Sequence, residues 1–133
     1  MRLFTLRAAA VALTNSLNRS QLGSDMGDVP RQGWITMLRY HVSAIATATQ
    51  LSKITIGTRD NDRRFLCSPS SGTWDADVDD ATQGALVLQF DPPIPYLITD
   101  DDLADTDNFA GMFVGNTLDA GTATADIEMV IRG

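Results

Sequence analysis

This chain of 133 residues has a net charge of −7, and hydrophobic residues make up 44% of it. That balance excludes an intrinsically disordered chain and predicts a single globular domain over residues 1–133. The single cysteine excludes an intramolecular disulfide. No stretch approaches the roughly 18 consecutive apolar residues of a membrane helix, so we expect no membrane span.

The choice of charged residues favours strands over helices. Of the 17 acids 16 are Asp, and of the 10 bases nine are Arg. Glu and Lys normally fill exposed helix faces, whereas Asp prefers turns, where its short carboxylate bonds the nearby backbone. Together with 10 Gly and 5 Pro, this composition predicts an all-β fold of strands joined by loops.

The N-terminal segment 1–33 is expected to be partly an arm or a long loop. Within it, residues 3–14 fit both a helical stripe and a strand face, and we favour a strand. Residues 34–48 have the β-branched and aromatic content of a strand without Gly or Pro. Strict alternation along that strand would place Trp34 on the same face as Leu38 and Tyr40.

A hairpin is predicted next, because residues 52–58 and 65–68 have strand composition and flank the turn-rich run RDNDRR. After a loop over 68–84, the apolar run ALVLQF (85–90) predicts a strand that is either buried on both faces or at the centre of a sandwich. Asp91-Pro92-Pro93 is expected to end it, since proline cannot donate to a β-ladder. A short strand follows at 94–99, and Pro95 favours an edge position for it. The remaining predicted elements are an acidic loop at 100–107, a strand at 108–114, a turn at 115–121 and a final strand at 123–132.

The final strand has the clearest pattern. Ala125, Ile127 and Met129 alternate with Asp126 and Glu128, which is typical of a sheet with one wet face. Counted together, the segments predict seven to eight short strands. That number and spacing favour a two-sheet antiparallel sandwich, and within that class a single jelly roll.

Most catalytic chemistries lack their residues here. His41 and Cys67 are the only histidine and cysteine, so a zinc site or a cupin-type metal centre has too few ligands. No nucleophile elbow, phosphate-binding loop or dinucleotide-binding fingerprint is present. We therefore expect no enzymatic activity and no cofactor.

Calcium is the one ion that the sequence makes credible. The run DADVDD (75–80) begins with the spacing of an EF-hand loop, but Asp80 stands at the glycine position and Leu86 at the final Glu position. Ordinary solvated turn aspartates are the favoured alternative. The calcium candidates are Asp75, Asp77, Asp79, Asp100 and Asp102.

Charge is divided unevenly along the chain. Residues 1–64 contain nine bases and four acids, whereas residues 65–133 contain one base and 13 acids. Complementary patches on one molecule suit contacts between identical copies; an acidic surface that merely maintains solubility is the alternative. A pI of 4.4 argues against nucleic-acid binding by the whole domain, although a basic arm with Arg2, Arg7 and Arg19 could still touch it. The predicted assembly contacts are Arg59, Arg63, Arg64, Asp100, Asp101 and Asp102.

Four segments resemble those of small jelly-roll virion proteins of bacteriophages, including capsid proteins. They are GWITMLRYHVSA (33–44), KITIGTRDNDRRF (53–65), ALVLQFDPPIPYLIT (85–99) and NTLDAGTATADIEMVIRG (116–133). The resemblance implies a structural role and a location in the virion, with copies of the chain and other virion proteins as partners. The alternative is a carbohydrate- or receptor-binding module of the same fold. In that module Trp74 would be the stacking platform, or else Trp34, Tyr40 or Tyr96.

Overall fold

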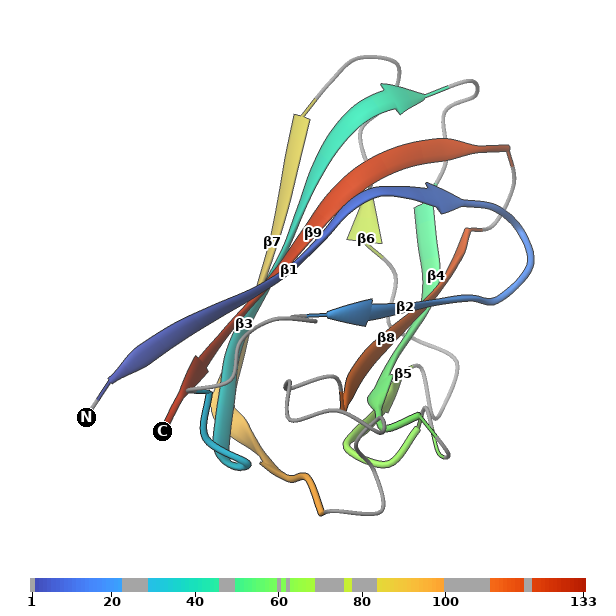
Figure 1. Ribbon diagram of the computed structural model, residues 1–133. Helices are drawn as coiled ribbons and strands as arrows, with labels where there is room; N and C mark the ends of the chain where they lie inside the picture. Colours follow the sequence, from blue (N-terminus) through green and yellow to red (C-terminus); the bar gives the residue numbers. More distant parts are fainter. Residues whose placement is uncertain are drawn as a thin grey trace.

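The computed structural model describes residues 2–22, 29–45, 50–59, 61, 63–68, 76–77, 84–99, 111–118 and 121–133. These residues form strands and no helix, so none of them belongs to a helix long and apolar enough to cross a membrane. The strands are β1 (Leu3–Leu13), β2 (Asn18–Leu22), β3 (Gln32–Ile45), β4 (Gln50–Gly57), β5 (Leu66–Ser68), β6 (Ala76–Asp77), β7 (Gly84–Leu97), β8 (Met112–Leu118) and β9 (Ala123–Arg132) (Figure 1).

The strands form two antiparallel sheets. The four-stranded sheet has the order β1-β9-β3-β7, and the five-stranded sheet has the order β2-β8-β4-β5, with the two-residue β6 also paired to β4. From β1 to β4, successive strands belong alternately to the four-stranded and the five-stranded sheet. The first strand, β1, and the last, β9, are neighbours in the four-stranded sheet (Figure 1). This is the jelly-roll arrangement of eight strands, which confirms the predicted all-β sandwich.

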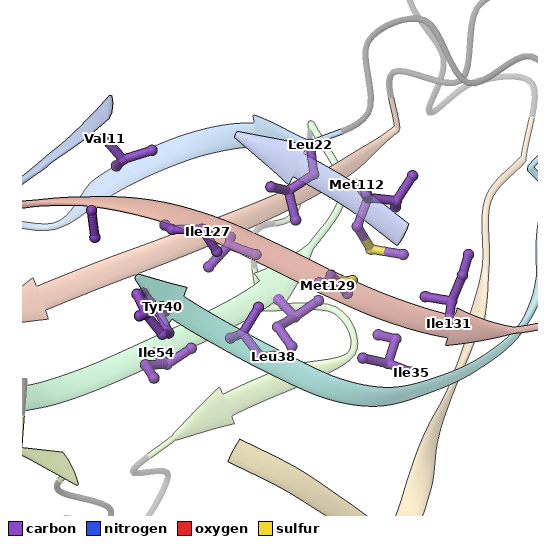
Figure 2. Close-up of a cluster of buried hydrophobic side chains, with 14 of the residues drawn as sticks. Val11, Leu22, Ile35, Leu38, Tyr40, Ile54, Met112, Ile127, Met129 and Ile131 are labelled. Carbon is purple, nitrogen blue, oxygen red and sulfur yellow. The ribbon is translucent and has the colours of Figure 1, made fainter. Parts of the chain in front are cut away.

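The core lies between the two sheets. Figure 2 shows Leu38 and Tyr40 of β3 and Ile127 of β9 gathered with Ile54 of β4 and Met112 of β8. All five side chains are fully buried. The alternation predicted for the last strand is confirmed, because the odd-numbered residues of β9 are buried and the even-numbered residues are partly exposed.

The N-terminal segment is a strand, as favoured from the sequence. β1 pairs with β9 from Leu3 to Leu13, with an irregularity between Ala8 and Val11, where Ala10 has a φ of 53°. Farther along, β2 pairs with β8. Much of the segment 1–33, predicted to be partly an arm or a long loop, therefore belongs to the two sheets.

One face assignment in β3 is wrong. The pairing register shifts between Ile35 and Met37, where β3 has one more residue than β9. The shift reverses the alternation, so Ile35 and Leu38 are both buried while Trp34 remains 45% exposed on the other face. Trp34 thus lies on the opposite face from Leu38 and Tyr40, because a bulge shifts the side-chain alternation by one residue.

The prediction that Asp91-Pro92-Pro93 ends a strand is also wrong. β7 continues from Gly84 to Leu97, and four residues of β7 fall opposite Thr36 of β3. The sheet tolerates these prolines because β7 is an edge strand, which needs no outward donors. β7 is also not buried on both faces, because one face of each sheet in a two-sheet sandwich faces solvent, and Val87 there is 46% exposed.

Residues 115–121 are not simply a turn, because Gly115–Leu118 lie within β8. Gly115 pairs with Thr55 of β4, and Asn116 is fully buried in the sandwich. Gly and Asn are typical turn residues, but here their small size and amide are used in packing. Tertiary contacts override the local preference.

Candidate assembly surface

The solvent-facing side of the four-stranded sheet, called here the outer face, collects exposed apolar side chains. Among the described residues five large hydrophobic side chains are exposed. Four of them belong to strands of this sheet and point outward, because their neighbours along the strand point into the core. Leu3 on β1 is 67% exposed and Leu97 on β7 is 47% exposed. Trp34 is on β3, which lies between β1 and β7 in the sheet. Single exposed apolar residues are ordinary on a monomer, but a group on one face marks an interaction surface.

An aromatic–arginine pair lies at the centre of this group. Arg132 of β9 is paired with Leu3 on one side and with Trp34 on the other. Its guanidinium carbon lies 5.3 Å from the centre of the Trp34 ring, a cation–π contact. Trp and Arg are the residue types enriched in interface hot spots.

Charged residues occupy the next rows of the outer face. Arg39 of β3 pairs with Glu128 of β9, with Nε donating to Oε1 at 3.0 Å and Nη2 at 2.9 Å from the same oxygen. Arg7 of β1 contacts Asp126 of β9, with 2.9 Å between Nη2 and Oδ2. His41 is exposed on β3 in register with Asp126. This charged band contains acids only on β9 and basic side chains on the flanking strands.

Asp126 is held in its charged form by β1. The backbone N–H of Ala10 donates to Oδ1 at 2.8 Å and Arg7 donates to Oδ2 at 2.9 Å. The Ala10 N–H bond, followed by the Arg7 contacts, lowers the pKa of Asp126 below its ordinary value of 3.8. The carboxylate therefore stabilises the bulge of β1 wherever it is ionised.

Asp126→Asn is expected to lower the free energy of unfolding at neutral pH. Because the folded-state pKa is depressed, the contribution of Asp126 is present above its unfolded-state pKa and is lost as the pH falls through the folded-state value. Urea unfolding at several pH values would show a difference between wild type and variant at pH 7 that shrinks in acid. The exposed Asp91 offers a matched control, Asp91→Asn. A difference independent of pH would contradict this role.

The solvent-facing side of the five-stranded sheet has another arginine contact. The guanidinium carbon of Arg19 lies 5.1 Å from the centre of the Phe113 ring, and Nη2 donates to the carbonyl oxygens of Thr58 and Arg59 at 3.2 and 2.6 Å. Arg19 therefore fixes the start of the β4–β5 connection. It is part of β2 rather than of a free basic arm.

The predicted assembly arginines Arg59, Arg63 and Arg64 lie together in the β4–β5 connection and are exposed. Arg64 stacks on Phe65, with 5.8 Å from its guanidinium carbon to the ring centre. Their predicted acidic counterparts, Asp100, Asp101 and Asp102, lie outside the described residues. The pairing of these two groups stays a prediction.

The described residues carry an excess of basic side chains. All ten Lys and Arg residues lie in the described part of the chain, and four of the 17 acids do: Asp77, Asp91, Asp126 and Glu128. The other acids lie outside the described residues. Complementary charges are thus present on one chain.

The calcium candidates and the main stacking candidate lie largely outside the described residues: Asp75, Asp79, Asp100, Asp102 and Trp74. Asp77 contributes its backbone to β6, while its side chain falls outside the described part. Within the described ranges no three His, Cys, Asp or Glu side chains gather as a metal site would require. The calcium prediction stays a prediction.

Two of the aromatic candidates for ligand stacking are wrong. Tyr40 is fully buried and Tyr96 is 3% exposed, so neither ring is available to a sugar. The Tyr96 hydroxyl donates to the carbonyl oxygen of Pro30 at 2.7 Å, and burial raises its pKa to about 12. Among the stacking candidates that the structure describes, Trp34 is exposed. The sequence did not single out its contact with Arg132 or the Arg39–Glu128 pair, because both depend on strand pairing.

Comparison with known proteins assigns this chain to no family. No protein-family model and no curated protein sequence matches it. Similar solved structures include the capsid asymmetric unit of cyanophage Pam1, with a TM-score of 0.46, 7% identity and coverage of 97% of this chain and 83% of that chain. FLHE gives a TM-score of 0.43 and 9% identity, over 98% of this chain and 94% of that chain. The decameric BFDV capsid protein gives a TM-score of 0.38 and 11% identity, over 98% of this chain and 96% of that chain. All three TM-scores are below 0.5, so the likeness concerns the general β fold.

Proposed function

We propose that this chain is a virion structural protein, a capsid or capsid-associated subunit, that assembles with copies of itself. One observation carries the self-assembly: four of the five large exposed hydrophobics among the described residues lie on the outer face. Leu3 and Leu97 lie next to the Trp34–Arg132 pair, and Val87 lies beside Arg39 in the charged band. An apolar patch with aromatic and arginine residues, next to a charged band, has the composition of a protein interface.

The shape of this surface suits assembly better than catalysis. Enzyme and small-ligand sites are usually concave pockets with convergent polar groups. The outer face is instead the open side of a four-stranded sheet, and its charged residues pair with one another across strands. We assign the chain no catalytic role and no cofactor. The virion location and other virion partners are supported by the resemblance of its strand pattern.

Light scattering coupled to size-exclusion chromatography tests the proposed self-assembly. We expect a mass that rises with concentration to multiples of 14.4 kDa, with defined particles visible by electron microscopy. A monomer at every concentration would contradict self-assembly. If that monomer also bound glycans on an array, the carbohydrate-binding alternative would take its place.

A further inference from the structure

We propose that the outer face of one copy packs on the outer face of a second copy around a two-fold axis. The axis runs parallel to the strands, between β9 and β3, so that β9 of each copy lies over β3 of the other. This contact rests on the proposed self-assembly and specifies the surface and the orientation that it uses.

The cross-strand register of β9 and β3 carries this inference. In successive rows Asp126 lies beside His41, and Glu128 beside Arg39. In these two rows the acids are on β9, and β3 carries the basic side chains. The two central strands of the sheet are complementary to each other row by row.

A two-fold axis parallel to the strands exchanges β9 and β3 and leaves each residue in its own row. Glu128 of one copy then lies over Arg39 of the second copy, and Asp126 lies over His41. In the apolar rows Val130 lies over Met37 of the second copy, since these residues pair within the sheet. Opposite charges then meet in the Glu128–Arg39 row, and apolar side chains meet in the Val130–Met37 row.

Other face-to-face orientations lack this match. A two-fold axis perpendicular to the strands would reverse the rows and place β9 over β9 and β3 over β3. Asp126 and Glu128 could then not both face the basic side chains that share their rows on β3. The pattern of charges therefore favours the parallel axis.

The Trp34–Arg132 row extends the same complementarity. Because Arg132 and Trp34 pair within one sheet, the exchange of β9 and β3 places Arg132 over Trp34 of the second copy. Each guanidinium, already 5.3 Å from its own Trp34 ring centre, would lie between two indole rings. This row lies at one end of the outer face and would add an aromatic contact there.

The size of the outer face is adequate for such a dimer. Four strands spaced about 4.8 Å apart and about 34 Å long cover roughly 650 Å² in projection. A standard specific interface buries about 800 Å² of accessible surface per partner, and accessible surface exceeds a flat projection. Two sheets packed face to face at about 10 Å would bury most of the outer face.

Charge reversal tests the contact between β9 and β3. Arg39→Glu and Glu128→Arg each place like charges in one row, so either variant alone is expected to lose self-association by about tenfold or more. An equimolar mixture of the two variants restores opposite charges between copies but not within either copy. The mixture is therefore expected to form heterodimers, measured by light scattering or analytical ultracentrifugation.

Lys53→Glu is a matched control, because Lys53 is a partly exposed cation on β4 in the other sheet. It is expected to leave outer-face dimerisation unchanged, and circular dichroism and thermal melts would show that all variants fold. Failure of the mixture to associate would overturn the proposed orientation.

An apolar substitution gives a second test that leaves the ion pairs intact. Trp34→Ser is expected to weaken dimerisation by about tenfold or more, as truncation of an interface hot spot does. Leu17→Ser is the control, because Leu17 is 42% exposed, close to the 45% of Trp34, but lies beside the five-stranded sheet.

The outcomes separate this contact from self-assembly in general. If the wild type assembles and Trp34→Ser and the charge variants assemble equally well, the outer face is not the contact, while the proposed function stands. If the wild type is a monomer at every concentration, both the contact and the proposed self-assembly are wrong.

Discussion

Gly115→Ala is expected to lower the free energy of unfolding by about 1–3 kcal/mol, the usual cost of overpacking a well-packed site. A Cβ atom at Gly115 would overlap the Thr55 Oγ1 and would come within 3.1 Å of Leu17 Cδ1. Gly115 and Thr55 are directly paired on β8 and β4, and Thr55 is fully buried, so its hydroxyl has little room to move. Urea unfolding would measure the loss.

A double-mutant cycle distinguishes this overlap from a general intolerance of alanine at Gly115. Thr55→Ala removes the hydroxyl that would collide, and that hydroxyl has no hydrogen-bond partner among the described residues. Gly115→Ala should therefore cost much less in the Thr55→Ala background, giving a coupling energy of at least about 0.5 kcal/mol. Equal costs in both backgrounds would show that the overlap is not the cause.

Tyr40→Phe is expected to lower the free energy of unfolding by about 1–3 kcal/mol, the cost of leaving a buried polar group unpaired. The Tyr40 hydroxyl on β3 donates to Oδ1 of Asn116 on β8, and both residues are fully buried. Asn116 Nδ2 already has no partner among the described residues. Removal of the tyrosine hydroxyl would leave the whole Asn116 side-chain amide without a hydrogen-bond partner among the described residues, and chemical denaturation would measure the loss.

The double variant Tyr40→Phe with Asn116→Leu is the control for this prediction. Replacing both partners with apolar groups of similar shape removes the unpaired amide, so the double variant should recover part of the stability lost by Tyr40→Phe. If the double variant loses more free energy of unfolding than the two single variants lose together, the assigned role of the hydrogen bond is wrong. This bond joins the two sheets, so it also fixes how the outer face sits on the sandwich.

Burial raises the pKa of Tyr40, which keeps its hydroxyl protonated and able to donate to Asn116. A polar link inside an apolar core favours one alignment of the two sheets over its neighbours, since a shifted alignment would leave both groups unpaired. The polar pair on β3 and β8 is therefore a constraint on register as well as a contact.

The fold class follows from the sequence because it depends on local properties. The scarcity of Glu and Lys, the turn-forming aspartates and the strict alternation of β9 each act within a few residues along the chain. The hairpin of β4 and β5 is equally local, since its turn lies between its strands. These features were enough to predict a two-sheet β-sandwich.

The candidate surface depends on contacts between distant segments. The bulge that moves Trp34 to the outer face arises where β3 pairs with β9, almost a hundred residues later in the chain. The prolines of β7 are tolerated only because that strand lies at an edge. Pro95 already indicated an edge strand from the sequence, but the register of a pair is not determined by one strand alone.

The sequence by itself determined the strand composition, the apolar face of β9 and the net negative charge of the chain. Only the tertiary structure decided that Asp126 and Glu128 share rows with His41 and Arg39, and that Arg132 reaches Trp34. The physical reason is that side-chain alternation is set along a strand, whereas cross-strand neighbours are set by hydrogen-bond register between strands.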